Sequence, residues 1–190
     1  MALMRNGEVY SWGNNENGQC GTGREPFQAV VHWIPKQVRF EEYQRPFIAV
    51  VSCGSDHSAF IDEIGRLFLC GKGDHGQIGN MSYSDELSPF YISKIPDKVQ
   101  EVACGIDHTV VLTRSGEIYT MGSNSRGQLG TGPPSRGQNV PCLLKELTFI
   151  RMTKIRAGLF SAAISLDNQL YLWGCGTFGD FYTPHRVKSV

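Results

Sequence analysis

One glycine-rich motif recurs four times along this chain of 190 residues, and that repetition constrains the fold more than any other feature. Each copy joins a short apolar stretch to a polar turn, as in Gly116-Glu-Ile-Tyr-Thr-Met-Gly-Ser-Asn-Ser-Arg-Gly-Gln-Leu-Gly130. The other copies begin at Gly7, Gly65 and Asn168, and the last one decays after Gly179. The glycines that close the apolar stretches are 58, 51 and 52 residues apart: Gly13, Gly71, Gly122 and Gly174.

A second motif precedes the first at a nearly fixed distance. In Cys53-Gly-Ser-Asp-His57 and Cys104-Gly-Ile-Asp-His108, the glycine stands eleven residues before the first glycine of the next apolar segment. Before the fourth copy the spacing is one residue shorter, and Phe160 takes the place of His57 and His108. Two motifs in constant order predict tandem structural units, at roughly 1–46 (partial), 47–97, 98–149 and 150–190.

Each unit is predicted to consist of β-strands. Short apolar runs such as Glu117–Met121 are bounded by glycine, and no window shows a sustained helical period. Ser115-Gly116 and Asp167-Asn168 are predicted hairpin turns, because glycine and asparagine tolerate positive φ. A unit of about 50 residues with roughly four short strands is typical of a propeller blade.

The paired motifs resemble the repeat of the regulator of chromosome condensation family over nearly the whole chain. The resemblance implies an all-β fold, a seven-bladed β-propeller of which 190 residues would form about half, or three to four blades. Aligning Tyr10 with Tyr119 makes Leu3 equivalent to Leu112, so we expect the chain to begin inside a blade. We expect residues 183–187 to open a further, unfinished unit.

A partial ring would leave strand edges and apolar blade faces uncovered at its two ends. We therefore expect a partner, a second propeller half or a missing segment of the same polypeptide to complete the propeller. An arc capped by its own terminal segments is the alternative interpretation.

The resemblance also implies a function. Most relatives of this kind act as non-enzymatic interaction or scaffold modules, which is our first hypothesis. The founding member is a nucleotide exchange factor for the small GTPase Ran, which implies acidic and histidine side chains on one face. Asp56 and Asp107, beside His57 and His108, match those positions. The sequence shows no counterpart of the inserted hairpin that the exchange factor uses, so exchange on a Ran-like small GTPase is the second hypothesis.

The longest segment between units, residues 24–46, contains the residue types that anchor protein interfaces. The alternative is that Val30, Trp33, Ile34 and Val38 form an outer strand with its packing. The candidate partner-binding residues, together with Asp56 and Asp107, are Trp33, Arg39, Phe40, Tyr43 and Arg45.

Several patterns that suggest chemistry have a simpler explanation in the repeat. The segment Gly71-Lys-Gly-Asp-His-Gly76 has dinucleotide-binding spacing, but no helix is predicted to follow it. Cysteine and histidine recur in pairs one unit apart rather than as a four-ligand cluster. We expect His57 and His108 to bond backbone groups of neighbouring strands or blades. The sequence therefore predicts no catalytic residue, no metal and no cofactor.

Charge, apolar run length and cysteine usage limit the classes of partner and the cellular location that we expect. Lysine plus arginine and aspartate plus glutamate number 18 each, which argues against a nucleic-acid partner. The longest fully apolar run is Phe47–Val51, too short to insert into a membrane, and the first residues show no secretion signal. The six cysteines show no pairing pattern. We expect an intracellular, reducing location, cytoplasmic or nuclear, and the resemblance adds cilium or cytoskeleton.

Overall fold

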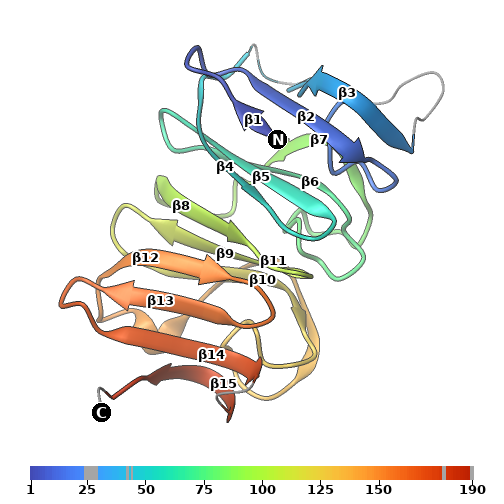
Figure 1. Cartoon of the computed structure of the whole chain (residues 1–190). Coiled ribbons are helices and arrows are strands. Elements are labelled where there is room, and N and C mark those ends of the chain that lie inside the picture. The colour runs from blue at the N-terminus through green and yellow to red at the C-terminus, as the bar shows by residue number, and fades with distance from the viewer. Residues whose placement is uncertain (24–29, 42, 44, 177–178, 189–190) are drawn as a thin grey trace.

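In the described part of the chain, four antiparallel β-sheets follow one another in sequence and stack as the blades of an open arc (Figure 1). The computed structural model describes residues 1–23, 30–41, 43, 45–176 and 179–188. Blade 1 contains β1 (Ala2–Leu3), β2 (Val9–Asn14) and β3 (Val31–Gln37). Blade 2 contains β4 (Ile48–Cys53), β5 (His57–Asp62), β6 (Leu67–Gly71) and β7 (Glu86–Tyr91).

The other two blades repeat this order of four strands. Blade 3 contains β8 (Val99–Cys104), β9 (His108–Thr113), β10 (Ile118–Asn124) and β11 (Ser135–Leu143), and a short 3-10 helix, η1 (Lys145–Leu147), follows it. Blade 4 contains β12 (Met152–Ala157), β13 (Ser161–Ser165), β14 (Leu170–Gly176) and β15 (Gly179–Arg186). The first strands of neighbouring blades contact one another, β4 with β8 and β8 with β12. The predicted all-β partial propeller is confirmed.

Strand register shows which part of a blade the chain begins with. Leu3 pairs with Val9 as Leu112 pairs with Ile118, so β1 corresponds to the second strand of the later blades. In blades 2, 3 and 4 the second strand pairs on both sides, whereas β1 pairs only with β2 among the described strands. The predicted equivalence of Leu3 and Leu112 is confirmed.

The expectation for residues 183–187 is wrong. Residues 183–186 lie in β15, which pairs with β14 and is the fourth strand of blade 4, and Val187 directly follows that strand, donating its backbone N–H to Leu170. The outer strands lack the repeated motifs and are largely exposed or half-buried, so their sequences carry little periodic signal.

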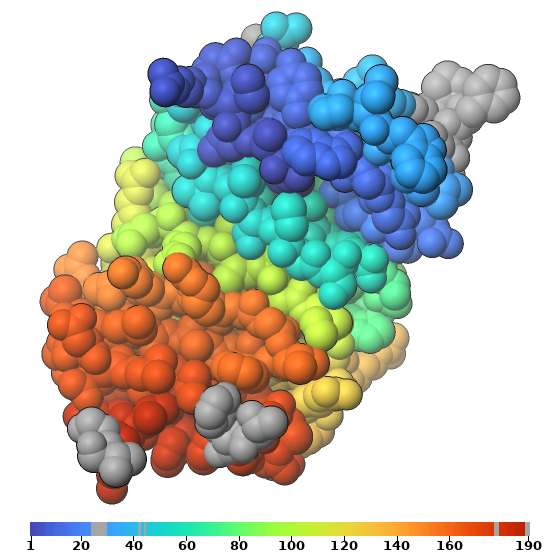
Figure 2. All heavy atoms as spheres, in the orientation of Figure 1, coloured from blue at the N-terminus to red at the C-terminus, as the bar shows by residue number. Residues whose placement is uncertain are grey.

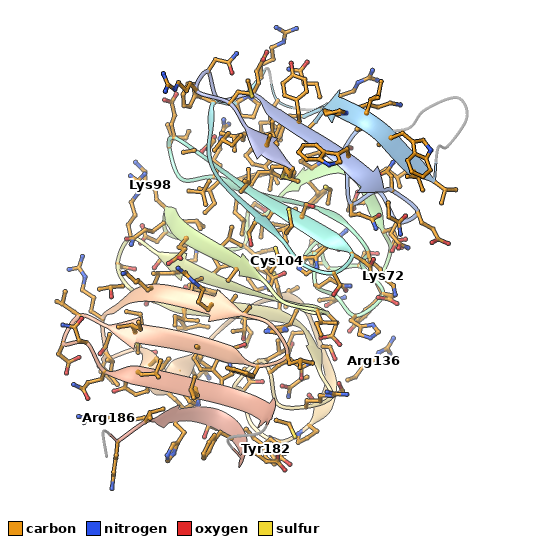
Figure 3. The ribbon with its side chains drawn as sticks, in the orientation of Figure 1. Lys72, Lys98, Cys104, Arg136, Tyr182 and Arg186 are labelled. Atoms are coloured by element: carbon orange, nitrogen blue, oxygen red, sulfur yellow. The ribbon has the colours of Figure 1, made fainter. Side chains whose placement is uncertain are left out.

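The predicted hairpin turns lie at the opposite ends of the strands from the repeated motifs. Gly116 has a φ of 93° and Asn168 a φ of 60°, the left-handed conformation that tight turns require. Two rims result. We call the ends that carry the Gly-x-Asp-His and Gly-Gln turns the motif rim, and the hairpin ends the hairpin rim. Figure 3 shows Lys72 and Arg136 at the motif rim and Lys98 at the opposite one.

The hydrophobic core that the described residues form lies between blades, in three clusters. Alternate side chains of each third strand face opposite neighbours: Ile118 packs with blade 4, whereas Tyr119 and Met121 pack with blade 2. Trp173, the counterpart of Met121, is fully buried against blade 3. Each blade therefore buries one face against the preceding blade and one against the following blade, and Figure 2 shows the blades closely packed in sequence order.

The two end blades break this rule. Trp12 of blade 1 is 46% exposed, whereas its counterparts Cys70, Met121 and Trp173 are each 0% exposed. Leu170 of blade 4 is 37% exposed, whereas its counterparts Val9, Leu67 and Ile118 are 1–2% exposed. Trp12, at the position that would contact a blade before blade 1, and Leu170, at the position that would contact a blade after blade 4, are thus both exposed to solvent.

Candidate partner-binding rim

Buried histidines join neighbouring blades just beneath the motif rim. Nε2 of His57 lies 2.9 Å from the Thr109 hydroxyl of blade 3, and Nε2 of His108 lies 2.8 Å from the Ser161 hydroxyl of blade 4. Thr109 and Ser161 in turn donate to the backbone carbonyls of Gln77 and Gln128, each at 2.8 Å. A hydroxyl has one proton, so each hydroxyl accepts its bond from the imidazole. Both rings therefore carry their proton on Nε2.

Burial keeps both imidazoles neutral. Desolvation, with a smaller contribution from the nearby His108, lowers the pKa of His57 from 6.5 to about 3, while Asp107 opposes the change. Desolvation also lowers the pKa of His108 to about 4, again opposed by Asp107. A neutral ring with a fixed Nε2 proton makes the bond between blades directional. The Nε2 partners are side-chain hydroxyls of the following blade rather than the expected backbone groups.

The recurring glutamine shapes the turn above each histidine. The side-chain oxygens of Gln19, Gln77 and Gln128 accept the backbone N–H two residues earlier, at 3.0, 2.9 and 2.8 Å. The amide nitrogens of all three reach acidic groups on the rim: Gln19 lies 3.4 Å from Asp56, Gln77 lies 3.4 Å from Asp74, and Gln128 lies 3.1 Å from Asp107. Each glutamine thus closes its own turn and orients a carboxylate on the rim.

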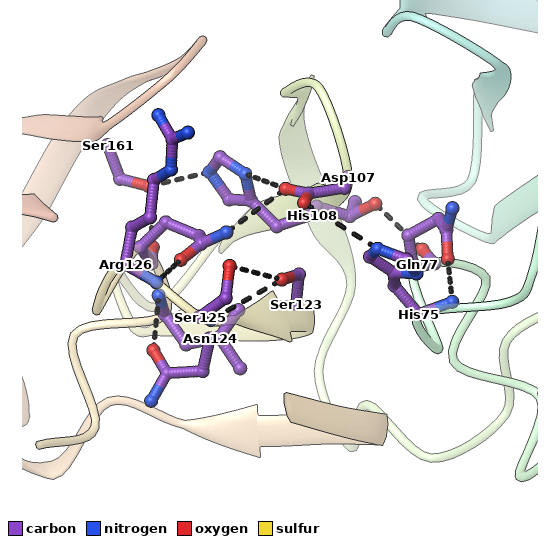
Figure 4. A network of polar contacts seen from close by, with 12 residues as sticks. His75, Gln77, Asp107, His108, Ser123, Asn124, Ser125, Arg126 and Ser161 are labelled. Atoms are coloured by element: carbon purple, nitrogen blue, oxygen red, sulfur yellow. Dashed lines mark hydrogen bonds and ion pairs between the residues drawn. The ribbon is translucent and has the colours of Figure 1, made fainter. Parts of the chain in front are cut away.

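Asp107 sits at the centre of this polar network (Figure 4). Its two oxygens lie 3.1 Å from Nε2 of Gln128 and 4.0 Å from Nε2 of His75. The side chain of Asp107 is 28% exposed and that of His75 is 45% exposed. The rim therefore presents a carboxylate and an imidazole beside buried hydrogen bonds, an arrangement suited to polar recognition of a partner surface.

The repeat glycines let the turns approach the strands closely. A Cβ added at Gly122 would lie 2.6 Å from the carbonyl oxygen of Asp107, and φ there is +108°. Glycine is required on both counts. Gly71 occupies the same position in blade 2, against the backbone of Asp56 and His57.

The candidate partner-binding residues of segment 24–46 do not form one surface. Residues 24–29, 42 and 44 lie outside the described part of the chain. Trp33 is 87% exposed on β3. Phe40 packs edge-on against Phe60 and Phe68, and Tyr43 packs against Phe68, so both support the contact between blades 1 and 2.

The two arginines lie near a cleft that opens toward the hairpin rim. Its volume is about 480 Å³, and its walls include Arg39, Phe40, Arg45 and the hairpin residues Asn6 and Gly7. The structure therefore brings Arg39, Phe40 and Arg45 together, and it places them away from Asp56 and Asp107 on the motif rim. Trp33 belongs to neither group.

Sequence reasoning missed Thr109 and Ser161 as the hydroxyl partners of the histidines, and it missed their counterpart in blade 2, Ser58. A signal existed, because a serine or threonine follows His57, follows His108 and follows Phe160. The role of the glutamines in holding Asp56 and Asp107 was also missed, although a glutamine recurs in three of the four units.

Among the described residues, no three histidine, cysteine, aspartate or glutamate side chains are grouped so that they could hold a metal ion. The described part of the chain also contains no helix of sufficient length and apolar character to cross a membrane. All six cysteines are free; Cys20, Cys70 and Cys104 are buried, and Cys53 is exposed.

These features define a class: a partial propeller of tandem blades of about 50 residues, joined by buried histidines at one rim. The family model described as the regulator of chromosome condensation (RCC1) repeat matches residues 6–61, 65–112 and 115–164. A second model of the same description matches residues 48–77 and 99–128. The chain belongs to this RCC1 repeat family.

Similar proteins share the repeat within larger chains. The human E3 ubiquitin-protein ligase HERC2 is 34% identical over 185 residues, covering 93% of this chain and 4% of that protein. The ultraviolet-B receptor UVR8 of Arabidopsis thaliana is 34% identical over 181 residues, covering 94% of this chain and 40% of the receptor. The X-linked retinitis pigmentosa GTPase regulator homolog of Caenorhabditis elegans is 33% identical and covers 92% of this chain and 12% of that protein. The chain thus spans well under half the length of these relatives.

Solved structures support the same fold. Human WBSCR16 matches with a TM-score of 0.84 and 24% identity, over 97% of this chain and 48% of that chain. Prp20p from Saccharomyces cerevisiae matches with a TM-score of 0.79 and 24% identity, over 100% of this chain and 49% of that chain. The arc of blades corresponds to about half of each of these structures.

Proposed function

We propose that this chain is a non-enzymatic protein-interaction module whose propeller is completed by further polypeptide. The exposure of Trp12 and Leu170 carries this proposal, because their counterparts in the other blades are buried. Apolar side chains placed in this way gain several kcal/mol only when another blade covers them. The completing material would supply such faces at both ends of the arc.

We propose the motif rim as the docking surface for a protein partner. Asp56 and Asp107 lie on this rim, and hydrogen bonds from Gln19 and Gln128 orient them. Preorganised charged groups favour specific recognition because little entropy is lost when a partner binds them. Trp33 on the exposed edge strand is a second contact candidate, since tryptophan is enriched among residues that dominate binding energy.

Affinity purification followed by quantitative mass spectrometry tests the docking surface. The chain with Asp56→Asn and Asp107→Asn should lose partners that the original chain retains. Glu63→Gln, on the hairpin rim, is a control because it removes one negative charge elsewhere and should retain them. Equal recovery of every partner by the Asp56/Asp107 variant would reject the motif rim as the docking surface.

Nucleotide exchange on a small GTPase is the second candidate function. Asp107, close to both His75 and Gln128, supports it, and so does the likeness to Prp20p, a protein with binding properties to Gsp1p and histones. Release of labelled GDP from a Ran-like GTPase distinguishes the candidates. Acceleration that disappears with Asp107→Asn would favour exchange, and no acceleration at micromolar chain would favour the interaction module.

We also propose an intracellular, reducing location, cytoplasmic or nuclear. Support comes from the six free cysteines, three of which occupy buried positions as small apolar side chains. Targeting to a cilium or to the cytoskeleton remains a proposal from the family resemblance. Fluorescence microscopy of the tagged full-length protein in its native cells tests both.

A further inference from the structure

We propose that the free edge of β1 and the cavity beside it form a binding site for one kind of segment: an extended strand that ends in a Gly-x-Asp-His turn. This inference rests on the proposed completion of the propeller and specifies the chemistry of the completing segment at blade 1. Three features of the described residues support it, and each has a paired counterpart in the later blades.

The cavity lies at the motif rim between blades 1 and 2 and has a volume of about 280 Å³. Its walls include Trp12 of blade 1 and the Gly54–Ser58 turn of blade 2. In blades 2, 3 and 4 the corresponding position, beside the second strand, holds the first strand of the blade and its turn. The cavity therefore has the location that a first strand and its turn occupy elsewhere in the fold.

The first feature is the hydroxyl of Ser58. Thr109 and Ser161, its counterparts, each donate to a glutamine carbonyl and accept from a histidine of the preceding blade. Ser58 donates to the carbonyl of Gln19 at 2.7 Å in the same way, but no described histidine donates to it. Ser58 is only 4% exposed, so it presents a buried acceptor for an imidazole N–H.

The second feature is the carbonyl of Gly54. The turn of each blade donates a backbone N–H to the glycine carbonyl of the next turn: Ser55 to Gly105 at 3.3 Å and Ile106 to Gly158 at 3.2 Å. Gly54 is the preceding member of this series and lines the cavity. No described turn donates a backbone N–H to the Gly54 carbonyl in this way. The turn of an incoming segment could therefore donate to Gly54 as Ser55 donates to Gly105.

The third feature is the space beside Gly13. At Gly122 an added Cβ would meet the turn backbone of its own blade, with the Asp107 carbonyl oxygen at 2.6 Å. At Gly13, the counterpart in blade 1, nothing lies within 4 Å among the described residues. The adjacent strand β1 pairs only with β2 among the described strands, which leaves its other edge open for antiparallel pairing.

These features together select a specific occupant. A strand alone could pair with β1, but only a turn with histidine four residues after the cysteine-equivalent position would also supply an imidazole to Ser58 and an N–H to Gly54. Residues 99–109 of this chain have that pattern in blade 3, so their sequence provides a probe of defined chemistry.

The test uses the whole chain and a synthetic peptide with the sequence of residues 99–109, in which Cys104→Ser prevents oxidation. Binding is measured by isothermal titration calorimetry and by tryptophan emission, since Trp12 lies in the cavity wall and the peptide contains no tryptophan. We expect saturable 1:1 binding with a blue shift of the emission, and a scrambled peptide should not bind.

Matched variants isolate the histidine–serine bond. His108→Ala in the peptide, or Ser58→Ala in the chain, should each weaken binding about three- to tenfold, the effect of one hydrogen bond. Combining the two changes should weaken binding no further than either alone. Ser58→Thr keeps the hydroxyl, as in blade 3, and should bind normally. Ser125→Ala, in another turn of the motif rim, is a control that should have no effect.

The inference is overturned if the peptide does not bind, if the scrambled peptide binds equally well, or if the two single changes are additive. The proposed function can be judged separately. Loss of partners through Asp56 and Asp107 in the purification experiment would support the interaction module even if the peptide failed to bind.

Discussion

Acidification should destabilise this fold through its two buried histidines. Their pKa values are lowered from 6.5 to about 3 for His57 and about 4 for His108, mainly by burial. In the unfolded chain both rings would titrate near pH ~6.5. Below that pH the unfolded state binds more protons than the folded state, so stability falls as pH falls. The stabilisation is complete above about pH 6.5 and is lost progressively toward about pH 4 for His108 and about pH 3 for His57.

The magnitude follows from the size of the pKa shifts. Each group contributes about 1.4 kcal/mol per pH unit between its unfolded and folded pKa values. From pH 7 to pH 5, each histidine should therefore lower the free energy of unfolding by about 2 kcal/mol, or about 4 kcal/mol for both. That is a large part of the roughly 5–15 kcal/mol typical of a domain.

Two variants separate the charge effect from the hydrogen bond. His108→Phe, the residue that blade 4 carries at Phe160, removes the titrating group and should reduce the loss between pH 7 and pH 5 by about 2 kcal/mol. It should cost about 1 kcal/mol at pH 7, because the bond to Ser161 disappears. Ser161→Ala breaks the same bond but leaves the imidazole buried, so it should keep the original pH dependence.

Urea unfolding at pH 7 and pH 5, followed by circular dichroism, measures these differences. Carboxylates and other groups titrate equally in all three proteins, so the comparison between variants isolates His108. If His108→Phe lost as much stability as the unmodified chain on acidification, burial of a neutral imidazole could not be the source of the pH dependence.

Three further predictions concern packing, glycines and thiols. Trp173→Ala removes a fully buried ring and should lower the free energy of unfolding by about 3–5 kcal/mol, whereas Trp33→Ala, at an 87% exposed residue, should change it by less than about 0.5 kcal/mol in denaturant titrations. Gly122→Ala should lower the free energy of unfolding by at least about 1 kcal/mol more than Gly132→Ala does. Both glycines have positive φ, but only Gly122 has backbone atoms within 3 Å of the added methyl group. Equal losses of stability in the same titrations would argue against the close turn contact. Iodoacetamide should label exposed Cys53 first and Cys104 only on unfolding, since burial raises the pKa of the Cys104 thiol to about 12. Mass spectrometry of timed samples measures the order of labelling, and equal labelling rates at the two cysteines would contradict the prediction.

Much of the fold could be predicted from the repeat because glycine positions and strand register are local properties. The positive φ of Gly116 and Asn168 and the pairing of Leu3 with Val9 depend only on residues close in sequence. The fourth strands could not be predicted in the same way. Residues 179–186 are largely exposed and lie outside the repeated motifs, so the sequence of β15 does not identify it as a strand.

The candidate site was harder to predict because it depends on how blades face one another. The bond from His108 to Ser161 spans 53 residues, and only the angle between blades brings the two side chains together. The aromatic residues of the first segment show a related difficulty. Phe40 and Tyr43 are residue types that are common in protein interfaces, but in the fold they pack against Phe60 and Phe68 of blade 2. Sequence alone does not reveal this contact between blades.

Sedimentation velocity of the isolated chain over a wide concentration range tests the central claim most directly. Apolar positions open at both ends of the arc, represented by Trp12 and Leu170, should drive association, so the average mass should exceed that of a monomer and increase with concentration. A chain that stays monomeric at every concentration, and unfolds in a single cooperative thermal transition, would contradict the claim that these faces require further polypeptide.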